Sequence, residues 1–418
     1  MSDRKVVWLI CNNVQPPEID THLRHQKFAQ YLYDDGYDVY IIGASYLHYS
    51  KINLIEGKEQ YIIREYNEQK LKYIFVKVSS YHENTGFKRL YSNFQFAWNL
   101  YRLKKHFPHP DIIVHNTRIP CDVPIYWTAK NTGAKYITET WDLWPYSFVT
   151  SGLISENGLF ARLAYSVEYF IYSHAKKNIF TLAGCKQYIM DHKWDKEHGG
   201  RIDLDNVVYI NNGIDLDEFN YNKNQYQIES DLLRNPSTRK IIYLGSVSKA
   251  NDINLIIETA KLFKSKKDIV FLIYGDGTER VVLEKKVEDE KIANVHFMNK
   301  WVEIKYVPFI ISCATINLLN YARTEEGKYG GSQGKLFQYL AAGKPIVSNN
   351  IMGYDIVNHY KAGISSNIDS PEDYKELICS LLNDDETYAK MSQSCKMAAK
   401  DFDYKNLYYK FKEVIENV

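Results

Sequence analysis

The feature that most constrains the fold of this chain is the alternation of short apolar runs with longer amphipathic segments. The runs are rich in Val, Ile, Leu, Phe and Tyr, and they lack the period-two pattern of a strand with one face in water. Strands buried on both faces, with helical segments between them, indicate parallel βαβ units. The predicted strands form two series, at 6–10, 39–42, 73–76, 111–115, 136–139, 178–181 and 207–210, and at 241–245, 269–275, 294–298, 314–319 and 344–348.

A polar stretch separates the two series. Residues 215–239 contain few aliphatic side chains and many Asn, Asp and Gln, as linkers do. We therefore expect an α/β protein of two Rossmann-like, doubly wound parallel-sheet domains, over 1–215 and 235–395, joined by a linker at 216–234. A helical segment at 396–418 is expected to return to the first domain. Ligands of open parallel sheets bind at the carboxyl ends of the strands, so the predicted site is a central cleft that the two domains face.

Composition and charge exclude several classes of function. The chain of 418 residues has 52 basic and 51 acidic side chains and a net charge of +1, so nothing favours a nucleic-acid partner. The six cysteines form no CxxC pair, which argues against a disulfide framework and against a zinc site. The first apolar run is shorter than the core of a signal peptide, and no run approaches the ~20 apolar residues of a membrane span. We expect a reduced, cytoplasmic protein.

The densest candidate site is a glycine-rich loop that leads into a predicted helix at about 335–342. Gly331, Ser332 and Gly334 allow close backbone approach, and the N–H groups at the start of a helix attract phosphate oxygens. Lys335 in the first turn opposes the helix dipole, which indicates an anionic ligand. The alternative is a flexible glycine loop without a ligand. The segment is not a Walker loop, because Leu336 follows the lysine.

Other strands of the second series are also followed by short polar loops. Ser246 and Lys249 follow its first strand, Asp276 and Gly277 follow its second, and Lys300 follows its third. Since ligands of such sheets bind at the carboxyl ends of the strands, these loops are candidates for the same binding site.

In the first domain, the loop after the first predicted strand has no glycine, since none occurs between Met1 and Gly36. The GxGxxG loop of a dinucleotide-binding domain is therefore absent, which argues against NAD or FAD. Arg24 and His25 lie in the first turns of the helix that follows. There they suit an anionic group or, alternatively, a solvated helix end.

A second motif of the first domain, ETWDLWP at 139–145, follows a predicted strand. A carboxylate such as Asp142 beside aromatic walls is partly desolvated, which raises its proton affinity and suits a general base. Trp141 adds an aromatic face of the kind that stacks on sugar rings, and Glu139 adds a second carboxylate. The alternative is an aromatic corner of the core in which Asp142 caps the next turn.

Several segments, taken in register, resemble one family. They are QPPEIDTHLRHQKFAQYLYDDGYDVYII, ETWDLWP, INNGIDLDEF, YGDGTER with NVHFM downstream, and GKLFQYLAAGKPIV, and together they span nearly the whole chain. In these segments the chain is similar to GT-B glycosyltransferases of the family 4 type. Within that family it resembles the bacterial branch that builds O-antigen, capsule and exopolysaccharide.

The resemblance implies a hexosyltransferase that moves a sugar from a nucleoside diphosphate to a glycan or polyprenyl-linked acceptor, with retention, without metal and without a cofactor. It implies a cytoplasmic enzyme. The donor diphosphate would meet the second domain at Gly331, Ser332, Gly334, Lys335, Ser246 and Lys249. The base and ribose would lie near Asp276, Gly277, Lys300 and Gln338. The acceptor would meet the first domain at Asp142, Arg24, His25, Glu139 and Trp141, and the catalytic residues would be Asp142 and Lys335.

Two departures from the family keep other functions open. The family has two glutamates eight positions apart around the glycine loop, and this chain has Gly330 and Gln338 there. A non-catalytic nucleotide-sugar-binding partner of a transferase is therefore one alternative. A nucleotide-sugar epimerase on the same two-domain architecture is another.

The segment at 87–107 combines aromatic side chains with several Lys and Arg. A basic aromatic helix of this kind can lie on an anionic bilayer, which would bring the protein into peripheral contact with the inner face of the cell membrane. The alternative is a partly buried helix with basic ends.

Overall fold

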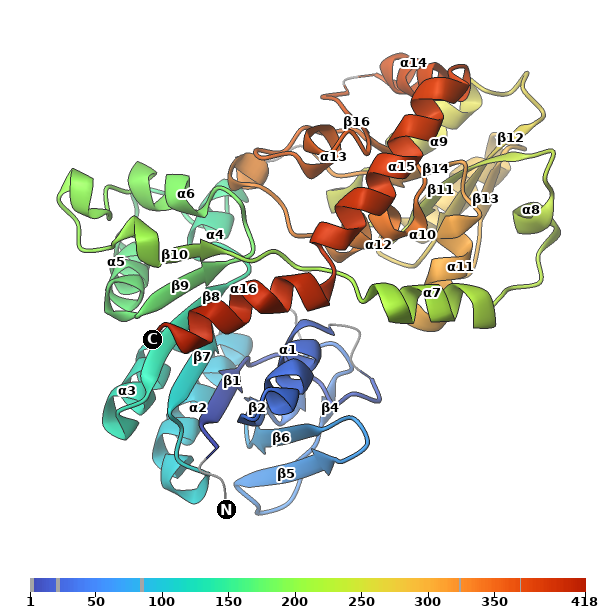
Figure 1. The fold of residues 1–418 in the computed structure, drawn as a ribbon. Coiled ribbons are helices and arrows are strands. Elements are labelled where there is room, and N and C mark those ends of the chain that lie inside the picture. The colour runs from blue at the N-terminus through green and yellow to red at the C-terminus, as the bar shows by residue number, and fades with distance from the viewer. Residues whose placement is uncertain (1–3, 20–22, 83–85, 323–324, 369) are drawn as a thin grey trace. The chain divides into compact units, whose positions relative to one another are not determined.

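The computed structural model of the protein describes residues 4–19, 23–82, 86–322, 325–368 and 370–418. The chain divides into two compact units, which we call the first unit (Met1–Asn211 with Leu407–Val418) and the second unit (Asn212–Asn406). Each unit is an α/β layer structure with its own parallel sheet (Figure 1). The predicted fold class, two doubly wound parallel-sheet domains, is confirmed.

The first unit is built on an eight-stranded sheet of order β10-β9-β8-β7-β1-β2-β6-β5. Neighbouring strands are parallel except for β5 and β6. The order reverses between β1 and β7, which makes this the topological switch point of the sheet. The strands are β1 (Val6–Ile10), β2 (Asp38–Ala44), β5 (Tyr61–Tyr66), β6 (Leu71–Val76), β7 (Ile112–Asn116), β8 (Lys135–Thr140), β9 (Lys177–Phe180) and β10 (Val207–Tyr209), beside a small hairpin of β3 (Tyr46–Leu47) and β4 (Ile52–Asn53).

Helices connect the strands of this sheet in the manner expected of βαβ units. They are α1 (Leu23–Asp34), α2 (Phe87–Leu103), α3 (Asp122–Thr132), α4 (Tyr146–Thr150), α5 (Leu159–His174) and α6 (Cys185–Asp191). The C-terminal helix α16 (Tyr404–Glu416) packs on α1. Phe411 stacks on Phe28 with ring centroids 4.5 Å apart, and the Lys412 ammonium lies 2.9 Å from the Asp35 carboxylate.

The second unit has a six-stranded, fully parallel sheet of order β13-β12-β11-β14-β15-β16. Its switch point lies between β11 and β14. The strands are β11 (Arg239–Leu244), β12 (Ile269–Tyr274), β13 (Val295–Phe297), β14 (Ile316–Leu319), β15 (Ile346–Ser348) and β16 (Gly363–Ser365). The helices are α7 (Leu216–Gln225), α8 (Asp231–Arg234), α9 (Ile253–Lys261), α10 (Arg280–Asp289), α11 (Val307–Ser312), α12 (Gly334–Ala342), α13 (Ile356–His359), α14 (Pro371–Leu382) and α15 (Asp385–Asp401).

The segment expected as a linker, 216–234, is instead part of the second unit, where it forms α7 and α8. The side chains of Asp215 and Ser230 cap these two helices by accepting hydrogen bonds from backbone N–H groups. Phe219 and Leu233 are buried in the core of the unit. The polar composition of the segment therefore reflects short helices with one exposed face rather than an unstructured connection.

The C-terminal helical segment also differs from the expectation of a single element at 396–418. Residues up to Asp401 complete α15, whose Cys395 and Ala398 are buried in the second unit. The chain then turns at Phe402, which accepts a backbone hydrogen bond from Ile214, while Tyr404 donates one back to Ile214. The helix that packs on the first unit is therefore α16, which begins eight residues after the predicted start.

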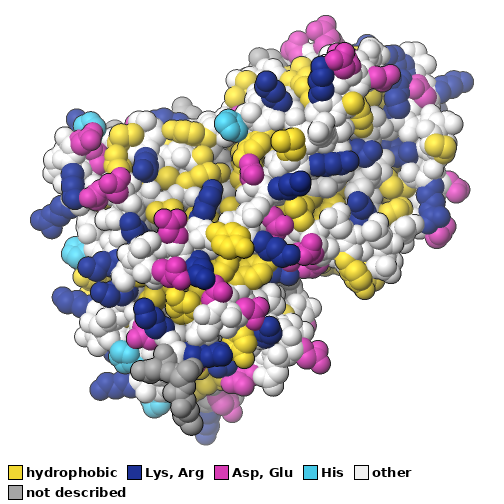
Figure 2. All heavy atoms as spheres, viewed as in Figure 1, with side chains coloured by type: hydrophobic (Ala, Val, Ile, Leu, Met, Phe, Trp, Pro, Cys, Tyr) yellow, Lys and Arg dark blue, Asp and Glu magenta, His cyan; other side chains and the backbone are white. Residues whose placement is uncertain are grey.

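The surface carries charges of both signs, as the balanced composition predicts. On the face shown in Figure 2, Lys and Arg side chains are interspersed with Asp and Glu. Among the helices described here, none combines the length and apolar composition needed to cross a bilayer.

Candidate functional site

The switch point of the second unit brings together the loops that follow β11 and β14. In open parallel sheets ligands bind at this point, outside the carboxyl ends of the strands. The backbone N–H of Ala322 donates to the carbonyl of Ala250 at 2.8 Å, and the Asn320 side chain donates to the carbonyl of Asp252 at 3.1 Å. These bonds fix the two loops against each other.

Hydrogen bonds also join the loops after β11, β12 and β13 at the edge of the sheet where the strands have their carboxyl ends. Val247 N–H donates to the Asp276 carbonyl at 2.9 Å, and Gly275 N–H donates to the Asn299 carbonyl at 3.1 Å. Gly275 has a φ of 116°, and a Cβ there would lie 2.0 Å from the carbonyl oxygen of Gly245, so only glycine allows this approach. The predicted donor-side residues Ser246, Lys249, Asp276 and Lys300 are exposed along this edge.

The glycine-rich loop enters the site between β14 and α12. A Cβ at Gly331 would lie 2.8 Å from Met352 Sδ, so the loop packs closely against that side chain. Asn212 donates from Nδ2 to the carbonyl of Ser332 at 3.0 Å. The residue before the helix, Gln333, makes no side-chain capping bond to it. The first turn of α12 therefore presents its N–H groups and the positive end of its dipole at the switch point.

Lys335 reaches from α12 across to the loop after β11. Its ammonium donates to Asn251 Oδ1 at 2.9 Å and lies 3.4 Å from the Tyr243 hydroxyl. The rings of Tyr321 and Tyr243 lie 4.6 and 4.9 Å from it, in cation–π geometry. Burial lowers the pKa of Lys335 to about 7. The contacts of this ammonium among the described side chains are with an amide oxygen and with tyrosines, none of them a carboxylate, so a bound anion would supply a counter-charge.

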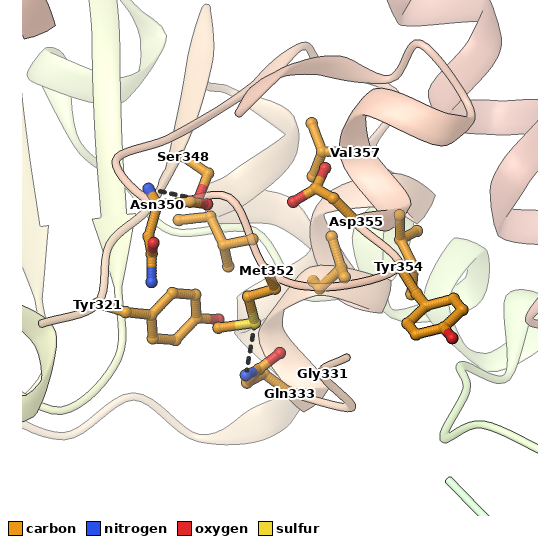
Figure 3. Close-up of a pocket in the computed structure, with 12 residues that line it drawn as sticks. Tyr321, Gly331, Gln333, Ser348, Asn350, Met352, Tyr354, Asp355 and Val357 are labelled. Carbon is orange, nitrogen blue, oxygen red and sulfur yellow. Dashed lines mark hydrogen bonds between the residues drawn. The ribbon is translucent and has the colours of Figure 1, made fainter. Parts of the chain in front are cut away.

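A small pocket adjoins the glycine-rich loop (Figure 3). Tyr321 lines this pocket and also contacts Lys335, so the pocket and the lysine share one wall. The Tyr321 hydroxyl and Gln338 Oε1 are both buried without a hydrogen-bond partner. Gln333 Nε2 lies 3.5 Å from Met352 Sδ, and both residues line the pocket (Figure 3). The pocket thus has one unsatisfied polar atom, the Tyr321 hydroxyl, on a wall that also contacts Lys335.

In the first unit, four of the predicted acceptor-side residues form one closed network instead of an open binding site. Arg24 donates from Nε to Glu139 Oε1 at 2.9 Å, and its other nitrogens donate to the carbonyls of Ile210 and Asn211. Arg24 and Glu139 are each 1% exposed. The carboxylate is held between this guanidinium and two further side chains, those of His25 and Trp141.

The other Glu139 oxygen completes this network. Trp141 donates from its indole N–H to Glu139 Oε2 at 3.1 Å, and His25 Nε2 lies 3.2 Å from the same atom. The His25 and Trp141 rings stack with centroids 5.1 Å apart. Burial acts to raise the pKa of Glu139, but the Arg24 charge and the hydrogen bonds outweigh it and hold the pKa at about 2. The prediction that Arg24 meets an anionic substrate is therefore wrong for this arrangement, because its donors are already used.

Asp142 lies just beyond this network and is exposed. The surrounding protein raises the pKa of Asp142, and the charge of Arg118 opposes the rise. Arg118 lies at the end of β7, with its guanidinium 5.7 Å from the centre of the Trp144 ring. Asp142 therefore remains available to a substrate, and a raised pKa suits it to accept a proton.

The sequence singled out Lys335 but missed the residues that surround it. Asn251, Tyr243 and Tyr321 lie in or next to the loops after β11 and β14, and Arg118 follows β7 in the first unit. Each stands within a few residues of the end of a predicted strand, so position along the chain was the signal that could have found them. None belongs to a recognisable motif.

The chain is similar to a known protein family, to a curated relative and to solved structures. The family described as "Glycosyl transferases group 1" matches residues 224–397. A curated relative, the 2-deoxystreptamine N-acetyl-D-glucosaminyltransferase of Niallia circulans, is 27% identical over 128 residues, or 30% of this chain. The match spans 31% of that relative, about a third of its length.

Solved structures match over nearly the whole chain. The Anabaena protein HepE in complex with UDP-glucose has a TM-score of 0.65 at 13% identity, covering 99% of this chain and 100% of that one. WaaG, described as a glycosyltransferase involved in lipopolysaccharide biosynthesis, has a TM-score of 0.65 at 17% identity, covering 98% and 99%. The chain thus has the GT-B fold, and the group 1 glycosyltransferase model matches residues of its second unit. These matches support the prediction of a hexosyltransferase that uses nucleotide sugars.

Proposed function

We propose that this protein is a hexosyltransferase that moves a sugar from a nucleoside diphosphate to an acceptor hydroxyl, with retention and without a metal ion. The observation that carries the proposal is the Lys335 ammonium, which lies beside the start of α12 at the switch point of the second unit and has no described carboxylate partner. A diphosphate fits this combination of a cation and helix N–H groups. HepE, which shares the fold, is seen with UDP-glucose.

The proposed chemistry rests on electrostatic stabilisation of the leaving group. As the glycosidic bond breaks, negative charge grows on the diphosphate, and Lys335 and the first-turn N–H groups of α12 stabilise it. No group of three or more His, Cys, Asp or Glu among the described residues is arranged to hold a metal. On the acceptor side, Asp142 takes the proton of the attacking hydroxyl. Ser246 and Lys249 lie on the diphosphate side, and contacts to the base and ribose come from Asp276, Gly277, Lys300 and Gln338.

We further propose that the protein belongs to the family 4 type and to the bacterial branch that makes O-antigen, capsule or exopolysaccharide. We propose a cytoplasmic protein whose acceptor is a glycan or polyprenyl-linked saccharide. This proposal rests on the segments ETWDLWP and GKLFQYLAAGKPIV and on the fold shared with WaaG.

A non-catalytic nucleotide-sugar-binding partner is the second candidate function, and one observation favours it. Gly330 has a φ of 103°, a backbone conformation in which a glutamate side chain would be strained. The position of the first family glutamate is therefore closed to that residue, and the second family position is Gln338. A nucleotide-sugar epimerase is the third candidate function, and its products would distinguish it from the other two.

Release of nucleoside diphosphate from a sugar donor separates these functions. We expect one of a panel of UDP-, GDP- and dTDP-sugars to raise the melting temperature of the full chain, because a ligand that binds only the folded state stabilises it. A transferase then releases the nucleoside diphosphate slowly into water and faster with an acceptor, with EDTA present. A binder releases none, and an epimerase changes the sugar without releasing it. Either of the last two outcomes contradicts the transferase, and an inverted anomer in the product contradicts retention.

The face of α2 supports the predicted membrane contact. Phe96, Ala97 and Leu100 are buried in the first unit, whereas the opposite side of the helix exposes large apolar side chains. These are Phe87 (81% exposed), Leu90, Tyr91, Phe94 and Trp98. Lys88, Arg102 and Lys105 are exposed on or next to the same helix. We propose that this face lies in the headgroup region of an anionic bilayer.

Replacing Phe94 and Trp98 together by Ser is expected to lower binding to vesicles of phosphatidylglycerol and phosphatidylcholine by about tenfold or more, since each buried aromatic side chain contributes about 1.5–3 kcal/mol. Co-sedimentation measures the bound fraction. The control is Val281→Ser with Val282→Ser on α10, which removes two side chains that are each 68% exposed. Equal binding of both variants and of the wild type would end the membrane proposal.

A further inference from the structure

The chain passes between its two units twice, and the first passage lies directly beside Arg24. The units divide between Asn211 and Asn212, and again between Asn406 and Leu407. Arg24 donates from its terminal guanidinium nitrogens to the carbonyl of Asn211 at 2.5 Å and to that of the residue before it at 3.0 Å. These two carbonyls are the last of the first unit before the chain leaves it. The arginine therefore holds the end of the first unit at its first passage.

The second passage is tied to the same arginine through two aromatic rings. The Arg24 guanidinium lies 4.8 Å from the centre of the Phe28 ring, and Phe28 stacks on Phe411 with centroids 4.5 Å apart. Phe411 belongs to α16, the helix in which the second passage lies. A guanidinium is attracted to the face of an aromatic ring, and stacked rings add contact energy of their own. Arg24 thus contacts the first unit beside both passages, directly at one and through Phe28 at the other.

The remaining donor of Arg24 leads to the turn that carries Asp142. Glu139 Oε1 accepts from Arg24 Nε at 2.9 Å, and Glu139 Oε2 accepts from the Trp141 indole N–H at 3.1 Å. The Trp141 carbonyl accepts from the Thr181 hydroxyl at 3.2 Å. Asp142 directly follows Trp141 in the chain and is itself exposed. One arginine therefore holds both the base of this turn and the end of the first unit.

Asn212, the first residue after the first passage, holds the glycine-rich loop of the second unit. Its side chain donates from Nδ2 to the Ser332 carbonyl at 3.0 Å. Ser332 lies three residues before Lys335, which the proposed function places at the donor diphosphate. The carbonyl of Asn211 and the N–H of Asn212 belong to one planar peptide group. The hydrogen bonds of Arg24 and Asn212 thus hold the residues at the two ends of a single rigid plane.

The shape of the guanidinium group is what joins these contacts. A buried ion pair often adds little net stability compared with apolar side chains of the same volume. What Arg24 supplies is direction, because its planar group presents donors at fixed angles to the Glu139 carboxylate and to the two carbonyls. A lysine would keep the positive charge, but its single nitrogen could not reach all three acceptors at once.

We propose that Arg24 is a positioning residue, which links the turn of Asp142 to the glycine-rich loop through the peptide group of the first passage. This inference rests on the proposed function, because it is the transfer reaction that needs both the proton acceptor and the diphosphate site. Displacing a reacting group by about 1 Å can slow a reaction about a hundredfold. Arg24 is buried and acts on the reaction through Glu139 and through this peptide group.

Replacing Arg24 with Lys separates this role from a purely structural one, because the charge beside Glu139 is kept while the carbonyls lose their donors. We expect Arg24→Lys to unfold at a higher urea concentration than Arg24→Met, while its kcat for transfer falls about tenfold or more at an unchanged donor KM. Arg162→Lys, at an exposed position of α5, is the matched control and should keep its kcat. A wild-type kcat for Arg24→Lys, or a loss no larger than the loss of folded protein, overturns the positioning role.

A double-mutant cycle tests whether Arg24 and Asn212 act through the same peptide group. Asn212→Ala removes the bond to the Ser332 carbonyl and should lower the kcat for transfer about tenfold or more. If the two residues act together, the double variant loses no more than about threefold beyond the slower single variant, instead of the product of both losses. Asn220→Ala, which removes a donor to the Leu216 carbonyl in α7, is the matched control and should keep its kcat. Fully multiplied losses overturn the link.

Hydrogen exchange tests the link without any activity assay. Asn212→Ala is expected to speed amide exchange about threefold or more in the glycine-rich loop at 330–334 and also in the turn at 139–147, because both segments lose an anchor. Asn220→Ala should change neither segment. Faster exchange in the glycine-rich loop alone overturns the link, whatever the rate of transfer. If both segments respond but the wild type releases nucleoside diphosphate from no donor, the proposed function fails and the link remains.

Discussion

Replacing Lys335 with Ala is expected to lower sugar transfer by about two to three orders of magnitude, the effect of removing one preorganised group that stabilises developing charge. The lysine reaches the loop after β11, where it bonds to Asn251, and it lies between two tyrosine rings. Among the described side chains no carboxylate matches its charge, so we expect its contribution to grow as the leaving group forms. Transfer rates at saturating donor measure the effect.

The matched control is Lys344→Ala. Lys344 follows the other end of α12 and is also a half-buried lysine whose pKa is lowered by burial. It has no role in the proposed site, so the control variant should keep its rate. Near-normal transfer by Lys335→Ala, or an equal loss in both variants, would contradict the diphosphate assignment.

The pH dependence of UDP binding gives a second measure of the same lysine. Burial lowers the pKa of Lys335 to about 7, and a bound diphosphate raises it. The favourable interaction is therefore fully present below about pH 7 and is lost as the pH rises above it, by up to about tenfold in affinity per pH unit. Calorimetry between neutral and alkaline pH should show this slope for the wild type and none for Lys335→Ala. A slope that persists in the variant would assign it to another group.

The sequence predicted most of the fold because the strands of a parallel sheet are buried on both faces and read as continuous apolar runs. The elements it missed lack that pattern. β5, with the sequence YIIREY, alternates between exposed and half-buried residues at the edge of its sheet, and β16 has three residues. The helices at 216–234 were obscured by polar composition, although Asp215 followed three residues later by Glu218 is a helix-start signal.

The sequence predicted only those parts of the site in which the type of a single residue indicates its chemistry. Glycines before a helix, and a lysine in its first turn, indicate a phosphate site wherever they occur. What surrounds Lys335 depends on how the loops after β11 and β14 meet, and this is set by hydrogen bonds such as Asn320 to the carbonyl of Asp252. Hydrogen bonds between loops so far apart in the sequence cannot be predicted from the spacing of neighbouring residues. For the same reason the pairing of Arg24 with Glu139 could not be predicted, and Arg24 was expected to bind a substrate.

The second large effect concerns that arginine. Replacing Arg24 with Met is expected to lower the free energy of unfolding of the first unit by about 3–5 kcal/mol, because it leaves the buried Glu139 carboxylate without its main partner. The carbonyls of Ile210 and Asn211 lose donors as well. Urea unfolding followed by tryptophan emission measures this, since all the tryptophans except Trp301 lie in the first unit.

Two further variants separate a structural arginine from a substrate-binding one. Arg24→Met combined with Glu139→Gln removes the stranded charge, so it should recover part of the lost stability. Arg162→Met, at an exposed position of α5, should change stability by less than about 0.5 kcal/mol. The Glu139 pKa of about 2 lies below the usual value, so its pairing contributes above about pH 4.5 and is lost only as the pH falls toward 2. Unfolding measured at neutral pH therefore shows the full contribution of this pairing to stability. Wild-type stability of Arg24→Met, together with weaker acceptor binding, would return Arg24 to the substrate site.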